Sequence, residues 1–194
     1  MTGEARAGYP PPYYLVLLHF PVCNKNGDVV TTAVANMDVH DIARAARTYG
    51  VQRYYIVTPL AAQVRLVEKI LAHWQEGYGA EFNPSRREAF QRVDVKTALD
   101  DAMEDMARRS GKRVRLVVTG AGLSNNALSC ETLRDMMLRE EDAYVLVFGT
   151  GWGLAAEVLD RADYRLAAVK GVSDYNHLSV RSAVSIVLDR LWGR

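Results

Sequence analysis

The fold is decided by residues 144–154, where the apolar run YVLVF passes directly into the glycine-bearing segment GTGWGL. An apolar run without polar alternation is typical of a strand that is covered on both faces. A similar passage follows, since the apolar stretch 164–169 leads into the polar segment 173–179 and a final helix. Open α/β sheets bind ligands at loops that leave the carboxyl ends of their strands. We therefore predict a ligand pocket between these two loops.

The rest of the chain alternates strand-like and helix-like segments. Besides the two strands above, apolar runs predict strands at residues 13–20, 53–58, 93–95 and 115–119. Apolar residues at three- and four-residue spacing predict helices at 39–49, 61–74, 97–110, 129–138, 154–159 and 178–192. Residues 77–84 are predicted to form a loop. This order predicts an α/β fold with a mostly parallel sheet and helices on both faces.

The composition is that of a globular protein, with 194 residues, 49% of them hydrophobic and 24% charged. It predicts a single domain over residues 13–194, preceded by a frayed tail at residues 1–12. The net charge of +1 gives no global attraction to a polyanion, although a local basic patch can still bind one. We expect no membrane-spanning segment, because no apolar run approaches the roughly 18 residues that a membrane helix needs. We also expect no metal site and a reducing, cytoplasmic location, because the only cysteines, Cys23 and Cys130, are far apart and have no metal-like spacing.

Several familiar nucleotide-binding signatures are absent from the sequence. There is no G-x-x-x-x-G-K-[ST] phosphate loop, and residues 149–153 lack the G-x-G-x-x-G spacing of dinucleotide-binding turns. The alternating glycines 149, 151 and 153 fit either a tight strand-to-helix turn or a close approach of backbone to a flat purine ring. An N-cap for the final helix explains part of segment 173–179, but not the whole polar cluster.

Three segments resemble the sequence motifs of SPOUT methyltransferases, the α/β enzymes with a trefoil knot. Residues 36–44 (NMDVHDIAR), followed by TYGV, are similar to the first motif, residues 148–154 to the second, and residues 176–183 (NHLSVRSA) to the third. Residues 14–192 as a whole resemble a small bacterial group of SAM-dependent RNA methyltransferases. The resemblance implies a C-terminal trefoil knot, a homodimer built on the first-motif and closing helices, and methyl transfer from S-adenosylmethionine to tRNA or rRNA, on base or ribose.

By position, the resemblance assigns residues of three loops to the cofactor: Thr119, Gly120, Ala121, Phe148, Gly149, Thr150, Gly151, Trp152, Gly153, Leu154, Val169, Gly171, Tyr175, Asn176, His177, Leu178 and Ser179. Polar and basic side chains outside these loops are candidates for contacts with RNA: Asn24, Lys25, Asn36 and Arg47. An ordinary turn explains Asn24 and Lys25 almost as well.

The candidate catalytic residues are Arg44, Asp38 and His40 of the first motif. Arg44 matches the catalytic arginine of the ribose-methylating branch, in which an asparagine replaces Asp38 and a glycine replaces His40. That branch also has a glutamate near the position of Gly151. Asp38 suits either a general base or the N-cap of the following helix, and the cap is favoured.

Two alternatives to an active RNA methyltransferase stay open. One is a Rossmann-like nucleotide-binding enzyme, which would bind NAD or ATP in place of S-adenosylmethionine. The other is a catalytically inactive SAM- or RNA-binding protein of the same fold, in which Arg44 would have no catalytic role.

Overall fold

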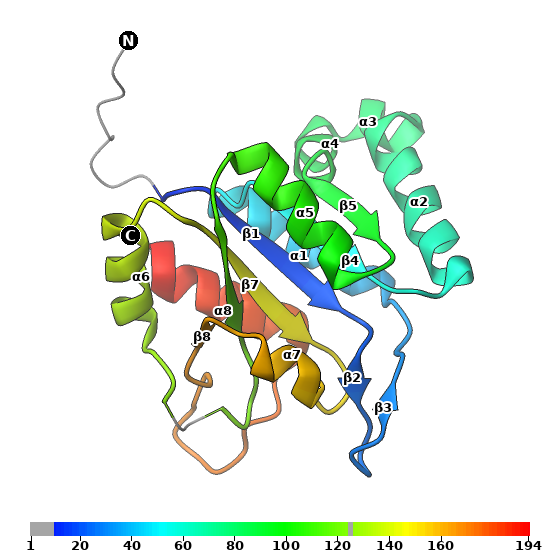
Figure 1. Cartoon of the computed structure of the whole chain (residues 1–194). Helices are drawn as coiled ribbons and strands as arrows, with labels where there is room; N and C mark the ends of the chain where they lie inside the picture. The colour runs from blue at the N-terminus through cyan, green and yellow to red at the C-terminus, as the bar shows by residue number, and fades with distance from the viewer. Residues whose placement is uncertain (1–9, 124–125) are drawn as a thin grey trace.

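The computed structural model describes residues 10–123 and 126–194, and its centre is a six-stranded sheet with the order β5-β4-β1-β7-β6-β8 (Figure 1). All neighbouring strands of this sheet are parallel. The strands are β1 (Tyr13–Leu18), β4 (Arg53–Val57), β5 (Val93–Lys96), β6 (Val114–Val118), β7 (Ala143–Gly149) and β8 (Tyr164–Arg165). The predicted parallel α/β sheet is confirmed, and the trefoil knot stays a prediction. Of the predicted frayed tail, residues 1–9 lie outside the described part of the chain.

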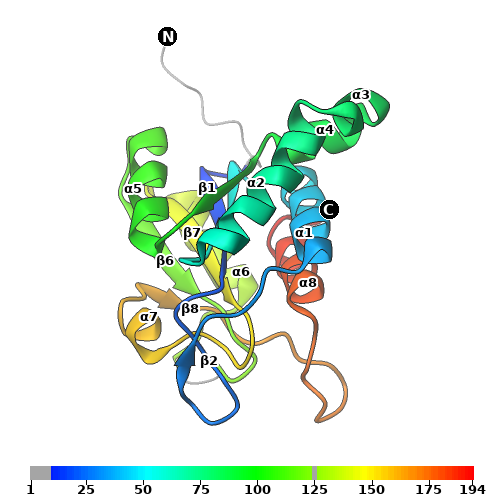
Figure 2. The same cartoon turned by 90° about the vertical axis from the view of Figure 1, so that its right-hand side faces the viewer.

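Helices cover both faces of this sheet, so its central strands β4, β1 and β7 are buried as their apolar composition predicts, while β5 and β8 at the edges are half-buried (Figure 2). Tyr13, Leu15 and Leu17 of β1 point into one core, which is closed by α1, α2, α4, α6 and α8. The alternate residues of β1 point into the second core, which is closed by α5 and α7. The helices are α1 (Asn36–Thr48), α2 (Ala61–Gln75), α4 (Pro84–Phe90), α5 (Leu99–Ser110), α6 (Cys130–Arg139), α7 (Ala156–Asp160) and α8 (Val180–Trp192).

Two predicted segments differ from the structure. The predicted loop at residues 77–84 is wrong, because α3 (Tyr78–Phe82) lies there and α4 begins at Pro84. Asn83 starts α4 by accepting a hydrogen bond from the Arg86 amide, and Ala80, Ala89 and Phe90 are buried. The last strand is shorter than predicted: the Leu166 amide still donates to the Val118 carbonyl of β6, but the Ala167 amide donates to the Leu128 carbonyl instead.

A small hairpin, which the sequence analysis missed, follows β1. Its strands are β2 (Val22–Cys23) and β3 (Val29–Val30). The Asn24 side chain closes the turn by accepting hydrogen bonds from the amides of Asn26 and Asp28 and by donating to the Asp28 carboxylate. An antiparallel bridge between Val22 and Leu154 places the hairpin beside the loop that follows β7.

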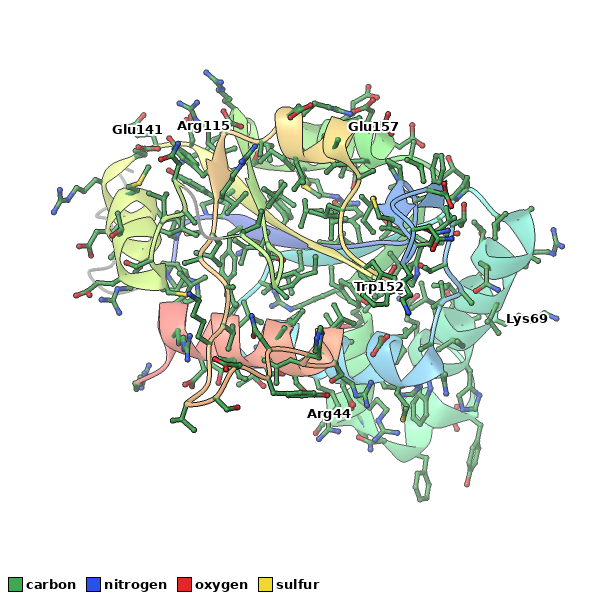
Figure 3. All side chains as sticks on the ribbon, turned by 90° about the horizontal axis from the view of Figure 1, so that it is seen from below. Arg44, Lys69, Arg115, Glu141, Trp152 and Glu157 are labelled. Carbon is green, nitrogen blue, oxygen red and sulfur yellow. The ribbon has the colours of Figure 1, made fainter. Side chains whose placement is uncertain are left out.

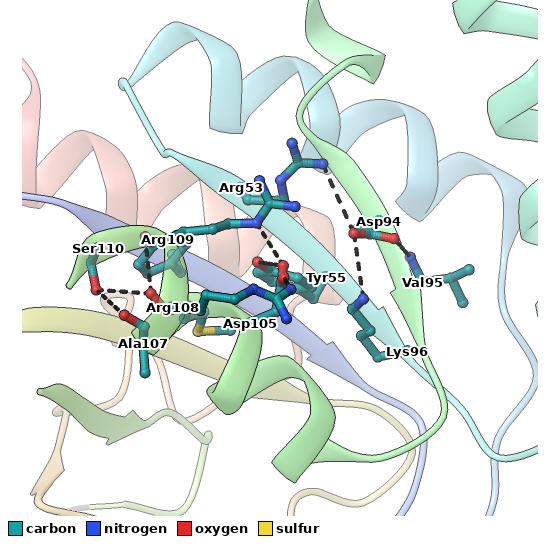
Figure 4. Close-up of polar contacts among 12 residues, drawn as sticks. Arg53, Tyr55, Asp94, Val95, Lys96, Asp105, Ala107, Arg108, Arg109 and Ser110 are labelled. Carbon is teal, nitrogen blue, oxygen red and sulfur yellow. Dashed lines mark hydrogen bonds and ion pairs between the residues drawn. The ribbon is translucent and has the colours of Figure 1, made fainter. Parts of the chain in front are cut away.

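A buried carboxylate ties α5 to the sheet, away from those strand ends (Figure 4). Asp105 accepts hydrogen bonds from Tyr55 Oη at 2.7 Å and Arg109 Nε at 2.6 Å, and also pairs with Arg108. Burial alone would raise the pKa of Asp105, but the hydrogen bonds from Arg109, Tyr55 and Arg108 outweigh it and hold the pKa well below its ordinary range.

We expect Asp105→Asn to lower the free energy of unfolding by about 2 kcal/mol at pH 7, because the charge-assisted bonds are lost. A folded-state pKa below the unfolded value of about 3.9 means that the stabilisation is complete above about pH 5 and is lost as the pH falls. Urea unfolding at several pH values checks both effects. Asp100→Asn, at an exposed pair with Arg161, is the control. Equal effects of the two substitutions would contradict the assignment.

None of the helices in the described part of the chain combines the length and the apolar character that a bilayer span requires. Within that same part, no cluster of histidine, cysteine, aspartate or glutamate is arranged to hold a metal ion.

Candidate active site

A cavity of about 800 Å³ lies at the carboxyl ends of β6, β7 and β8. Three loops line it, at residues 119–123, 148–154 and 166–169, together with residues 176–178 before α8. Asp38 of α1 and residues of α8 complete the wall. Figure 3 views the molecule from below, where the loop that carries Trp152 lies beside the hairpin. The volume of the cavity is near the upper end of the range of about 300–1,000 Å³ that is common for small-molecule sites.

The end of β7 and the loop that follows it are tightly packed around two glycines, Gly149 and Gly151. A Cβ atom on Gly149 would lie 3.0 Å from the Leu154 amide nitrogen, and one on Gly151 would lie 3.0 Å from the Cys23 carbonyl oxygen. Gly151 also has a φ of +61°, which disfavours any other residue. The Trp152 amide donates to the Cys23 carbonyl at 3.0 Å, and the Cys23 amide donates to the Gly153 carbonyl at 2.9 Å. The loop is therefore fixed against the hairpin.

A chain of hydrogen bonds through two threonine hydroxyl groups and a histidine connects the same loop to the end of β1. The Thr150 hydroxyl lies 3.1 Å from the Leu18 carbonyl and must donate to it, so it accepts from Thr32. Thr32 in turn accepts from His19 Nδ1 at 3.0 Å. This order places the proton of His19 on Nδ1. Burial lowers the pKa of His19 to about 4, so the imidazole is neutral at physiological pH.

The cavity wall contains one carboxylate among its described residues, that of Asp38. Asp38 is 7% exposed, and its Oδ1 lies 3.2 Å from a terminal nitrogen of Arg181 in α8. Arg181 Nε also lies 3.6 Å from Asp41. The prediction that Asp38 caps α1 is wrong: the helix begins at Asn36, and Ala35, in an extended conformation, is the N-cap. Asp38 instead lies in the first turn of the helix, where the helix dipole stabilises a negative charge.

The residues of this cavity fit a nucleoside with a polar tail. Apolar side chains of Leu123, Leu159, Leu166 and Val187 form walls for a flat ring, and the loops offer peptide groups at close range because their glycines lack side chains. These are the features that an adenosine-containing cofactor requires.

Residues 12–193 match the model of a protein family described as SAM-dependent RNA methyltransferase. The chain belongs to this family. The Rossmann-like alternative is therefore wrong, and S-adenosylmethionine is the cofactor of the methyltransferase.

Two relatives are similar to the methyltransferase in sequence, and one solved structure is similar to it in fold. An uncharacterized protein of Aquifex aeolicus is 39% identical over 93% of this chain and 88% of its own length. A tRNA (guanine-N(1)-)-methyltransferase of Nitratidesulfovibrio vulgaris is 43% identical over 93% of this chain, but the match spans only 42% of that longer protein. The SpoU methyltransferase AviRb of Streptomyces viridochromogenes, solved with AdoMet, superimposes with a TM-score of 0.58, at 12% identity, over 98% of this chain and 62% of AviRb. The last match concerns the fold alone.

Most residues that the sequence assigns to the cofactor lie together in the cavity of the methyltransferase: Thr119, Gly120, Ala121, Phe148, Gly149, Thr150, Gly151, Trp152, Gly153, Leu154, Val169, Asn176, His177 and Leu178. Gly171, Tyr175 and Ser179 are exposed and are not among the lining residues. The Ser179 hydroxyl has a structural role, because it accepts a hydrogen bond from the Ser182 amide and caps α8.

The other residues of the first motif do not line the cavity of their own chain. His40 packs edge-on against Trp74 and Phe90, with ring centroids 5.4 Å and 4.8 Å away, which gives it a packing role. Arg44 lies on the outer side of α1, 3.9 Å from Asp41 (Figure 3). Arg47 pairs with Glu88.

The remaining RNA candidates also lie outside the cavity lining. Asn36 is exposed at the start of α1, Lys25 is exposed at the hairpin tip, and the Asn24 amide is engaged inside the hairpin turn. Sequence analysis missed Arg181, Thr32 and His19 as parts of the site. The hairpin signal, NKNG between valine-rich segments, was the available clue to Thr32 and its neighbours.

Proposed function

We propose that this protein methylates tRNA, with S-adenosylmethionine bound in the cavity between the loops 119–123, 148–154 and 166–169 and residues 176–178. The observation that carries the proposal is the position of the Asp38 carboxylate in the wall of the glycine-lined cavity. The tRNA methyltransferase named above supports tRNA as the substrate class, although the match covers less than half of that protein. The bound cofactor supplies an electrophilic methyl group on sulfur.

In this proposal, the peptide groups of residues 119–121 and 149–154 hold the cofactor, and Asn176 to Leu178 close the cavity beside α8. Asp38 accepts the proton that the acceptor atom of the nucleotide loses as the new bond forms. Arg181 holds the carboxylate in place from the start of α8. Alignment of acceptor and donor in a fixed cavity supplies the remaining rate enhancement.

The proposal includes a homodimer through α1 and α8, in which Arg44 serves the cavity of the partner. Exposed apolar side chains beside the cavity support it, among them Met37 at 59% and Leu178 at 48% exposure. Arg44 points outward from the same helix that carries Asp38 inward.

Mixing two variants tests the shared site. We expect Arg44→Ala and Gly151→Arg each to be inactive alone, and a refolded mixture to regain about a quarter of the wild-type activity. Half of a random mixture is heterodimer, and each heterodimer has one complete site. Sedimentation velocity confirms that the mixture is dimeric. No recovery in a dimeric mixture would contradict the contribution of Arg44 across the interface.

The substrate is tested by incubating the protein with tritiated S-adenosylmethionine and separate pools of unmodified tRNA and rRNA transcripts. The proposal predicts label in tRNA that is absent with Gly151→Arg. Label in rRNA alone would overturn the substrate class. Cofactor binding without label in either pool would favour the inactive SAM-binding alternative.

A further inference from the structure

Trp152 presents a large aromatic ring to solvent at the edge of the cavity. It is 63% exposed, although it belongs to the loop that forms the cavity wall. Trp74 and Trp192, by contrast, are partly buried against the main core. An indole is rarely left in water without a use, because its burial is among the most favourable of any side chain.

The backbone around Trp152 fixes where the ring stands. Gly151 and Gly153, on either side, have φ angles of +61° and +112°, and the Gly153 amide donates to the Thr150 carbonyl at 3.1 Å. The Trp152 amide is held by the Cys23 carbonyl of the hairpin. The tight turn is therefore stabilised by its own peptide groups and by the hairpin.

The surroundings of the ring suit a nucleotide. Lys25 is exposed at the tip of the hairpin to which the Trp152 loop is bound, and it can attract a phosphate. Unpaired RNA bases are commonly recognised by stacking on aromatic rings. Enzymes that modify a base take it out of the helical stack and hold it between such surfaces.

Resting on the proposed function, we infer that Trp152 is the stacking platform for an unpaired nucleobase of the RNA substrate at the mouth of the cavity. Trp152 then contacts RNA through its ring, while the peptide groups of the same loop face the cofactor. Lys25 contacts the phosphate backbone next to that base.

The test measures RNA and cofactor binding separately. Trp152→Ala is expected to raise the Kd for an unmodified tRNA transcript pool about 10-fold, within the range of one base–aromatic stack. Trp152→Phe restores affinity to within about twofold, since the ring is kept. The Kd for S-adenosylhomocysteine, from calorimetry, stays unchanged in both variants.

Tyr78→Ala is the matched control, because Tyr78 is also a largely exposed aromatic residue, at 73%, on α3, outside the cavity lining. Tyr78→Ala is expected to leave RNA binding unchanged. The inference is overturned if Trp152→Ala binds RNA as tightly as the wild-type protein does, or if Trp152→Ala and Tyr78→Ala lose RNA affinity equally. It is also overturned if Trp152→Ala loses affinity for S-adenosylhomocysteine together with RNA affinity. A wild-type protein that binds no S-adenosylhomocysteine refutes the proposed function instead, whatever Trp152 does.

A direct readout uses the fluorescence of Trp152 itself. In a Trp74→Phe, Trp192→Phe protein, Trp152 is the remaining tryptophan, since the chain has three. Stacking predicts quenching by the tRNA pool and by adenosine monophosphate, at concentrations at which S-adenosylhomocysteine leaves the emission unchanged. Quenching by S-adenosylhomocysteine alone would show that the Trp152 ring contacts the cofactor and not RNA, and would overturn the inference.

Discussion

Gly151→Arg is expected to weaken the binding of S-adenosylhomocysteine by more than about 100-fold, or about 2.7 kcal/mol. A Cβ atom at this position meets the Cys23 carbonyl oxygen at 3.0 Å and the Thr32 methyl group at 3.3 Å. Its φ of +61° adds strain of about 1–2 kcal/mol. The loop and the hairpin must shift apart to relieve both and to make room for the rest of the arginine side chain, and the wall of the cavity moves with the loop.

Gly27→Arg separates the loss of the cavity from backbone strain. Gly27 has a φ of +87° at the hairpin turn, and a Cβ atom there meets nothing within 4 Å. The same substitution there should reduce stability without changing the affinity for the cofactor. Calorimetric titration of both folded variants gives the comparison, and equal affinities would show that residues 149–154 do not hold the cofactor.

Asp38→Asn is expected to lower kcat by about 100- to 10,000-fold, which is the contribution usual for a general base. Asparagine keeps the size of the side chain and an oxygen for Arg181, but it takes up no proton. The Kd for S-adenosylhomocysteine should stay within about twofold of wild type, because the peptide groups of the loops are intact. Single-turnover methyl transfer to tRNA measures the effect on the chemical step.

Asp41→Asn is the matched control for this substitution. Asp41 contacts the same Arg181 at 3.6 Å, but it is exposed and is not among the residues that line the cavity. Its substitution should change kcat by less than about threefold, since exposed pairs contribute about 1 kcal/mol or less. A similar loss in both variants would mean that Asp38 only anchors α8.

Regular periodicity made much of this fold predictable from the sequence. The apolar runs of β1 and β7 have no polar alternation, which requires cover on both faces, and the structure provides it. Gly50 and Gly111, in left-handed conformations, end α1 and α5 as their positions after apolar-periodic segments indicate. By contrast, α3 and α4 have five and seven residues, too few to show a helical apolar period, and α4 is held by the packing of Phe90 against Trp74 of α2.

The candidate site, too, was predictable only in part from the sequence. Its glycine loops were predictable because they follow strands, and parallel strands bring their carboxyl ends together. The pairing of Arg181 with Asp38 was not, because it joins residues 143 positions apart through the packing of α1 on α8. The cap assigned to Asp38 failed because the helix already begins at Asn36, with Ala35, a residue without a capping side chain, as its N-cap.

Hydrogen–deuterium exchange with and without S-adenosylhomocysteine tests the central claim, that the glycine-lined cavity holds the cofactor. The predicted result is slower exchange in peptides covering residues 119–123, 149–154 and 167–178, with α3 and α5 unchanged. Saturating ligand that protects only segments outside these loops would contradict the site proposed for the cofactor.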